Sequence, residues 1–181
     1  MKRLWTLFVT TAMVLPSIAG APELAKASLT LNVAGKGEIV IELYPDKAPQ
    51  AVGHITSLAD QGFYNGQKFF RVIKDPRPFL VLFGDPQTKT LDINDSRIGE
   101  GGSGKRIAYE NSGLTNKKGA VGLSTKQGDK NGGDSQFYIL LDDKPFLDGT
   151  YTVFGQVAKG MEIVSRIEVG DQVTSVSVSR G

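Results

Sequence analysis

The chain has 181 residues, of which 40% are hydrophobic and 22% charged, as expected for one globular domain with a short leader. It contains no cysteine, which excludes disulfides, cysteine nucleophiles and a cysteine-linked lipid anchor. A single histidine is too few for a histidine-based cluster of transition-metal ligands.

The first 27 residues have the features of a secretory signal peptide. Two basic residues precede an apolar run, residues 4–19, which a proline interrupts. The sequence AKA at 25–27 then offers a small-x-small cleavage site. We therefore expect a signal peptide over 1–27, a mature domain over 28–181, and export to a periplasm or to the outside of the cell.

Two alternatives to this processing stay open. Cleavage could follow AGA at 19–21, although Pro22 would then begin the mature chain. The segment could also remain as a membrane anchor, although a short apolar run with a proline disfavours a stable span. Cleavage after Ala27 would leave 18 basic and 18 acidic residues of the 21 and 19 in the chain. The mature domain is then formally neutral, so we expect no membrane span after processing and no nucleic-acid partner.

The first half of the domain combines strands with one helix. Alternating apolar residues predict a hairpin of two strands, residues 29–33 and 39–43. Apolar residues at helical spacing predict a helix across 52–59, which Gly62 would end. Two short apolar runs, 68–73 and 79–83, are typical of further strands on either side of KDPRP.

The second half begins with a loop-rich stretch, residues 86–118. After it come three predicted strands, a second helical stripe and a last strand, at residues 119–124, 135–141, 152–157, 161–167 and 172–179. Many short strands with two helices indicate an antiparallel barrel or a sandwich with helices at its ends.

The sequence GEGGSGKR, residues 99–106, almost matches a phosphate-binding P-loop. A P-loop needs a hydroxyl after its lysine, but Arg106 stands there, and the motif neither follows a buried strand nor opens a helix. We interpret it as a glycine-rich surface loop that binds no nucleotide.

Two isolated side chains are candidates for chemistry. His54 lies in the predicted first helix, where a packed or surface histidine is the simpler interpretation. A Ser-His-Asp triad through it is not ruled out, although no serine lies in a G-x-S-x-G turn. Arg71 follows two phenylalanines, and strand alternation would place it on the face of Phe69, with Phe70 and Val72 opposite. A solvated surface arginine is the alternative.

The chain resembles the cyclophilins, a family of β-barrel peptidyl-prolyl isomerases. The resemblance runs from about Leu29 to the C-terminus and rests on eight blocks in the family's order: GEIVIELYPDKAP, GFYNGQKFFRVI, FGDP, ENSG, GAVGLS, SQFYILL, FLDGTYTVFGQV and GMEIV. It implies a closed antiparallel barrel of eight strands capped by two α-helices. It also gives the glycine-rich segment a place, because cyclophilins carry such a loop between the GDP and EN blocks.

The resemblance assigns the catalytic arginine to Arg71. The histidine that precedes it in the family is replaced by Phe70, and the family's pocket phenylalanine and methionine fall on Phe79 and Leu80. Leu82 occupies the position of a glutamine that normally hydrogen-bonds the arginine. The other residues that the resemblance assigns to substrate binding are Gln127, Gln136, Tyr138, Phe146, Leu147 and Tyr151.

These residues suit a non-covalent isomerase of proline peptide bonds that assists the folding of exported proteins. Arg71 would stabilise the twisted bond, and no cofactor or metal would take part. The expected partners are proline-containing unfolded or flexible polypeptides, and we expect a monomer. The alternative is a proline-peptide binding module with weak catalysis, because Leu82 deprives Arg71 of its partner. A hydrolase is a third and more distant class.

Overall fold

The computed structural model describes residues 27–126 and 128–181. Most of the predicted signal peptide, residues 1–26, lies outside the described residues, and so does Gln127. Within the described ranges, no helix combines the length and the apolar character that a membrane crossing needs.

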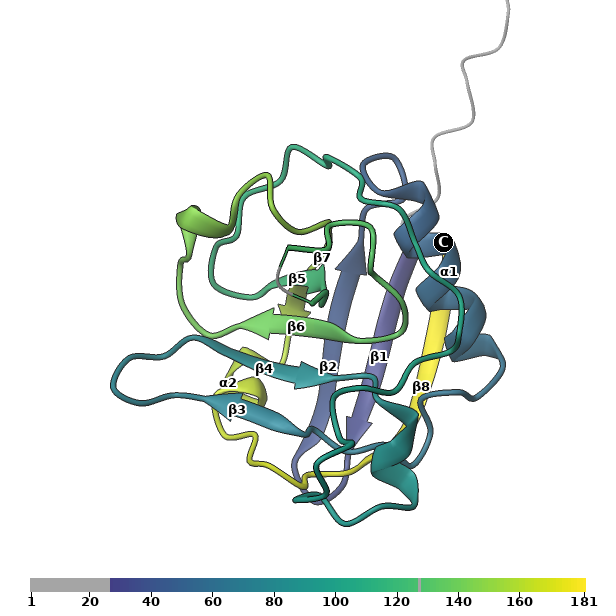
Figure 1. The fold of residues 1–181 in the computed structure, drawn as a ribbon, viewed down its shortest axis with the longest axis vertical. Coiled ribbons are helices and arrows are strands. Elements are labelled where there is room, and N and C mark those ends of the chain that lie inside the picture. The colour runs from purple at the N-terminus through teal and green to yellow at the C-terminus, as the bar shows by residue number, and fades with distance from the viewer. Residues whose placement is uncertain (1–26, 127) are drawn as a thin grey trace, which may run out of the picture.

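Eight antiparallel strands form one strongly curled sheet (Figure 1). In the order β3-β4-β6-β5-β7-β2-β1-β8, neighbouring strands are hydrogen-bonded. The strands are β1 (Ala27–Val33), β2 (Gly37–Leu43), β3 (Arg71–Ile73), β4 (Leu80–Phe83), β5 (Ala120–Leu123), β6 (Phe137–Leu140), β7 (Val153–Lys159) and β8 (Val173–Arg180). The sequence predicted each of these strands, although some of the bounds differ.

The first hairpin shows how the sequence determines the sheet. In β1, every second residue is buried, and Leu29 and Leu31 stand opposite Ile41 and Ile39 of β2. Because side chains alternate between faces, this register places all four on the inner face. The turn between the strands contains Gly35, whose φ of +68° is a conformation that glycine adopts without steric cost.

Two α-helices lie on opposite sides of the sheet in Figure 1. Helix α1 (Pro49–Asp60) begins with a proline at its first turn and buries an apolar stripe that includes Val52, Ile55 and Leu58. Helix α2 (Met161–Val164) is a single short turn against β2 and is shorter than the predicted stripe. Two 3-10 turns, η1 (Pro86–Lys89) and η2 (Pro145–Leu147), lie in the connections.

The expectation of a closed barrel is wrong. The two edge strands, β3 and β8, do not pair with each other, so the sheet is an open, curled half-barrel. Backbone hydrogen bonds between residues 66–69 and 170–173, such as Phe69 N–H to Asp171 O at 2.9 Å, cross the gap between its edges. The cause is the shortness of β3, because the strand predicted from residue 68 begins only at Arg71.

The sheet separates two apolar clusters. The inner cluster is the main core, and its fully buried aromatic residues are Tyr64, Phe69, Phe83, Phe137 and Phe154. The outer cluster lies on the opposite face of β4, β5 and β6, and its buried members are Leu80, Leu82, Ala120, Tyr138, Leu140 and Val153. Strand alternation produces both clusters from the same strands, since Phe83 points inward while Leu82 points outward.

Candidate active site

A row of side chains crosses the outer face of the sheet. Arg71 of β3 is paired with Leu82 of β4, Leu82 with Tyr138 of β6, and Tyr138 with Gly122 of β5. Paired residues on neighbouring strands share a face, so the guanidinium-bearing side chain begins a row that continues as an apolar surface. Gly122 is paired in turn with Val153 of β7, and a Cβ at Gly122 would overlap the Tyr138 hydroxyl.

The outer apolar cluster collects most of the residues that the resemblance assigned to substrate binding. Leu80, Leu82 and Tyr138 are buried in it, and further members are only partly covered: Phe70, Phe79, Leu147 and Tyr151. Phe146 lies at its margin with 71% of its surface exposed, and its ring centre is 6.2 Å from that of Phe79. An apolar surface that the protein leaves partly exposed to solvent can bind an apolar ring of a ligand.

Arg71 stands at one edge of this cluster. It is the first residue of β3, it is exposed, and its side chain forms no hydrogen bond or ion pair with any residue that the structure describes. Its cross-strand neighbour Leu82 is 9% exposed and has no polar atom to offer. The departure from the family pattern that the sequence revealed therefore lies directly opposite Arg71 in the sheet.

The prediction for the faces around Arg71 is wrong for the two phenylalanines, whereas Val72 lies on the opposite face from Arg71 as expected. Phe69 packs in the inner core together with Val72, whereas Phe70 contacts the outer cluster and lines the same groove as Arg71. Simple alternation fails because the two phenylalanines precede β3 and lie in irregular backbone.

A buried polar network fixes the floor of the cluster, and sequence reasoning missed it. The Tyr138 hydroxyl donates to Asn116 Oδ1 at 2.6 Å, and the Asn116 side-chain amide donates to Asp148 Oδ1 at 2.9 Å. Burial raises the pKa of Tyr138, because the ionised phenol would lose its hydration, and the acidic groups of Tyr151 and Asp148 add to the shift. Asn116 lies in a loop whose local sequence gives no sign of this contact.

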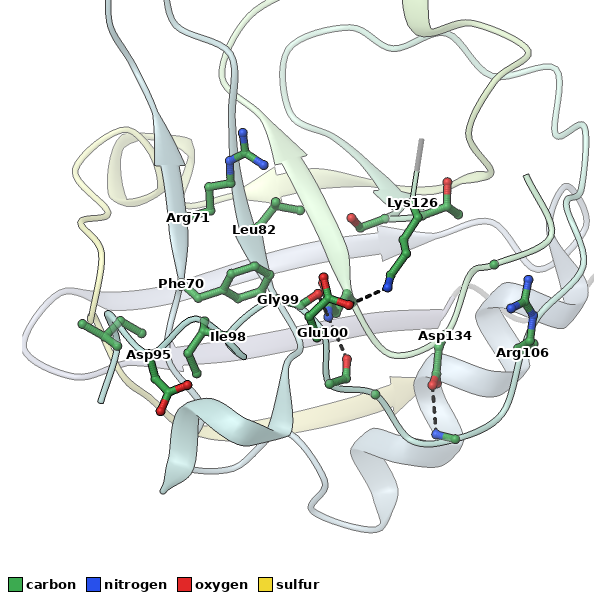
Figure 2. Close-up of a pocket in the computed structure, with 18 of the residues that line it drawn as sticks. Phe70, Arg71, Leu82, Asp95, Ile98, Gly99, Glu100, Arg106, Lys126 and Asp134 are labelled. Carbon is green, nitrogen blue, oxygen red and sulfur yellow. Dashed lines mark hydrogen bonds and ion pairs between the residues drawn. The ribbon is translucent and has the colours of Figure 1, made fainter. Parts of the chain in front are cut away.

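A groove of about 770 Å³ extends from Arg71 along the glycine-rich loop. Figure 2 shows Arg71, Phe70 and Leu82 at one end of the groove and Asp134 and Arg106 at the other. An exposed ion pair joins Lys126 to Glu100 on its walls, and Arg106, another lining residue, pairs with Asp129. The groove is therefore polar, in contrast to the outer apolar cluster. The groove and the cluster meet at Phe70, Arg71 and Leu82.

The glycine-rich loop, residues 99–106, wraps around carboxylates of its own chain. Asp85 is fully buried, and its Oδ2 accepts from the backbone N–H of Gly99 at 2.5 Å, while Asp134 Oδ2 accepts from Gly104 at 2.9 Å. A Cβ at Gly101 would overlap Asp85, so the loop must be glycine-rich to approach so closely. The backbone amides of Gly99, Gly101 and Gly104, which a P-loop would direct at phosphate, thus already donate to Asp85 and Asp134. The absence of a nucleotide stays a prediction.

Gln136 also holds this loop. Its side-chain amide donates to the carbonyl oxygens of Gly99 and Gly101, at 2.9 and 2.7 Å. Both amide hydrogens are therefore used within the protein, which leaves Oε1 as the group that can still bind a ligand in the groove.

His54, Ser103 and Asp134 come together, but not with the geometry of a hydrolase triad. Both partners approach the same ring nitrogen, His54 Nε2, with Asp134 Oδ1 at 3.2 Å and Ser103 Oγ at 3.3 Å. In a triad, the carboxylate orients the imidazole through Nδ1 while the serine meets Nε2. His54 is buried, as the interpretation of a packed histidine expected.

Comparison with known proteins shows the family of the chain. The family model for the cyclophilin type peptidyl-prolyl cis-trans isomerase matches residues 28–180. The chain belongs to the cyclophilin family. It is therefore an enzyme of the isomerase class, and its outer apolar cluster with Arg71 is the candidate active site of a cyclophilin.

Several named cyclophilin relatives cover most of the chain. A peptidyl-prolyl cis-trans isomerase of Helicobacter pylori is 37% identical over 159 residues, which are 87% of this chain and 90% of the relative. A probable isomerase of Brucella suis is 38% identical over 145 residues, covering 78% and 72%. A Cryptosporidium parvum cyclophilin, crystallised in the presence of the dipeptide Ala-Pro, superposes with a TM-score of 0.72 at 20% identity, over 85% of this chain and 99% of that one. At that identity the likeness establishes the fold.

Proposed function

We propose that the domain catalyses the cis–trans isomerisation of X–Pro bonds in exported polypeptides, with Arg71 as the catalytic group. The observation that carries this proposal is the position of an exposed arginine, free of partners among the described residues, at the edge of an incompletely covered apolar cluster. A proline ring would lie on the cluster, and the flanking polypeptide would enter the polar groove.

The chemistry requires only a well-placed cationic donor. Rotation about the X–Pro bond is slow, with a barrier of about 18–20 kcal/mol, because amide resonance is lost in the twisted state. The nitrogen then carries a lone pair that can accept a hydrogen bond. A guanidinium is permanently charged and donates without a proton transfer, so it can stabilise the twisted bond more than the planar one.

The apolar residues around Arg71 have complementary roles in this proposal. Phe79, Leu147 and Tyr151 would contact the proline ring from the sides, and Leu80, Leu82 and Tyr138 would form the floor. Phe146 would contact residues near the proline, because it is the most exposed aromatic side chain at the margin. No step in this scheme forms a covalent bond.

The export of the protein rests on its N-terminal sequence alone. The features of residues 1–27 support a periplasmic or extracellular protein whose partners are unfolded or flexible proline-containing chains.

The test is the isomerisation rate of a short X–Pro peptide with the domain and with Arg71→Ala. We expect Arg71→Ala to lower kcat/KM by about 10²–10³-fold, by analogy with the loss of one preorganised donor to a transition state. Binding of the planar peptide should change far less. Arg77→Ala, which removes an exposed arginine of the β3–β4 connection, is the matched control.

Two results would contradict this proposal. A parent domain that binds proline peptides without accelerating their exchange would be the binding module instead. An active parent whose Arg71→Ala variant keeps its rate and its circular dichroism spectrum would place the catalytic group elsewhere.

A further inference from the structure

Asp134, which lines the far end of the groove, belongs to a cluster of three polar side chains that the isomerase chemistry does not use. Asp134 precedes β6, Ser103 lies in the glycine-rich loop, and His54 comes from α1. Ser103 Oγ donates to Asp134 Oδ1, and the same oxygen lies 3.2 Å from His54 Nε2. The side chains of His54 and Asp134 are 5% and 19% exposed, so these contacts are shielded from water.

Both oxygens of the Asp134 carboxylate contact polar groups of the protein. While Oδ1 meets Ser103 and His54, Oδ2 accepts from the backbone N–H of Gly104 at 2.9 Å. A Cβ at Gly102 would overlap the same carboxylate, so the chain runs tightly around it. Asp134 therefore links two consecutive loop residues, Ser103 and Gly104, to His54 of helix α1, and Gly102 packs closely against it.

The loop that is fastened in this way forms a wall of the groove. Gly99, Gly101, Gly102 and Gly104 all line it, as Asp134 itself does. At its other end, the loop packs on Phe70, since a Cβ on Gly99 would stand 3.5 Å from the Phe70 ring. Phe70 precedes Arg71, so the position of the loop affects the junction between groove and apolar cluster.

We propose that Asp134 is a positioning residue of the isomerase, which, with Ser103 and His54, holds the glycine-rich loop in place as a wall for the substrate. The proposal rests on the proposed function, in which a polypeptide occupies the groove. Glycine-rich segments lose much conformational entropy on ordering, and a loop that is ordered beforehand spares a ligand that cost. This set of contacts among Asp134, Ser103 and His54, the clamp, therefore affects the binding of long substrates and not the rotation of the X–Pro bond beside Arg71.

The first variant for the test is Ser103→Ala, which removes a single hydroxyl. The substrates are a blocked X–Pro dipeptide and the same unit extended by four residues on each side. We expect KM for the extended peptide to rise about two- to tenfold, the effect of one lost hydrogen bond, while kcat and the dipeptide kinetics stay unchanged. Ser165→Ala is the matched control, because that exposed hydroxyl donates to the Glu162 carbonyl at the end of α2, and Ser165 does not line the groove.

Two variants of Asp134 separate hydrogen bonding from bulk. Asp134→Asn can still accept from Gly104 through its oxygen and donate to Ser103 and His54 through its amide, whereas Asp134→Leu can do neither. We expect the Asp134→Asn variant to retain the affinity for the extended peptide within about twofold. The Asp134→Leu variant should lose this affinity. Equal losses in the two variants would overturn the clamp, and so would equal effects on the dipeptide and the extended peptide.

Hydrogen exchange of the Gly104 amide provides a measurement independent of catalysis. It should accelerate in Ser103→Ala and in Asp134→Leu, but not in Asp134→Asn. Unchanged exchange in Asp134→Leu would overturn the proposal even if KM rose. If the parent domain proved inactive, the proposed function would fail, while the exchange data would still decide whether Asp134 orders the loop.

Discussion

Leu82 is the residue that most distinguishes this site from the family pattern. Its side chain lies opposite Arg71 on the outer face, and its neighbour Phe83 points into the inner core. Phe83 therefore does not block a longer side chain at position 82, which the sequence alone could not show. A glutamine at this position could hydrogen-bond the guanidinium and restrict its motion.

We accordingly expect Leu82→Gln to raise kcat/KM by up to about 10²-fold, the effect ascribed to placing a catalytic group correctly. Leu80→Gln is the matched control, because Leu80 is equally buried in the same cluster but pairs with Ile73. It should lower the free energy of unfolding by about 1–3 kcal/mol, since its amide has no partner, without raising the rate. A rate gain in both variants, or in neither, would contradict this role of position 82.

At the scale of elements, the glycine-rich loop illustrates two different reasons for glycine. Gly101 needs space, because a Cβ would overlap Asp85 and the Gln87 side chain. Gly104 needs conformational freedom, because its φ is +87° although nothing crowds it. Neither reason is visible in the sequence GEGGSGKR, where the two glycines look equivalent.

These reasons predict different costs for alanine. Gly104→Ala should lower the free energy of unfolding by about 1 kcal/mol, the strain of a left-handed alanine. Gly101→Ala should cost more, about 1–3 kcal/mol, because Asp85 or the loop must move. Denaturant unfolding of both variants measures the difference. A Gly101→Ala variant as stable as the parent would mean that Asp85 does not occupy the loop.

The elements themselves were largely predictable, and the contacts between distant segments were not. Alternation revealed the strands because one face of each is buried, and helical spacing revealed α1 for the same reason. Local patterns gave no sign that β3 would shorten to three residues or that Asn116 would meet Tyr138. Such contacts join residues far apart in the chain, so they depend on the whole topology. The row from Arg71 to Tyr138 followed from the family resemblance, which supplied that topology.

At the scale of the whole molecule, the predicted processing removes very little of the sheet. Ala27 is the first residue of β1, where it pairs with Leu43 and Arg180. Cleavage after Ala27 would take away only this terminal pair. We expect mass spectrometry of the exported protein to give Ser28 as the first residue. A protein that begins at Pro22, or that retains residues 1–27, would contradict the predicted cleavage.

The place of β1 in the sheet has a consequence for how the chain folds during synthesis. β1 is the earliest strand of the described residues, yet it lies between β2 and β8, and β8 is the last. A ribosome releases β8 only when almost the whole domain has been made, so until then β1 is an unprotected edge. Loop closure over the full length of the domain must precede this pairing, which favours slow, late folding. The nascent domain thus remains incomplete until its final residues emerge.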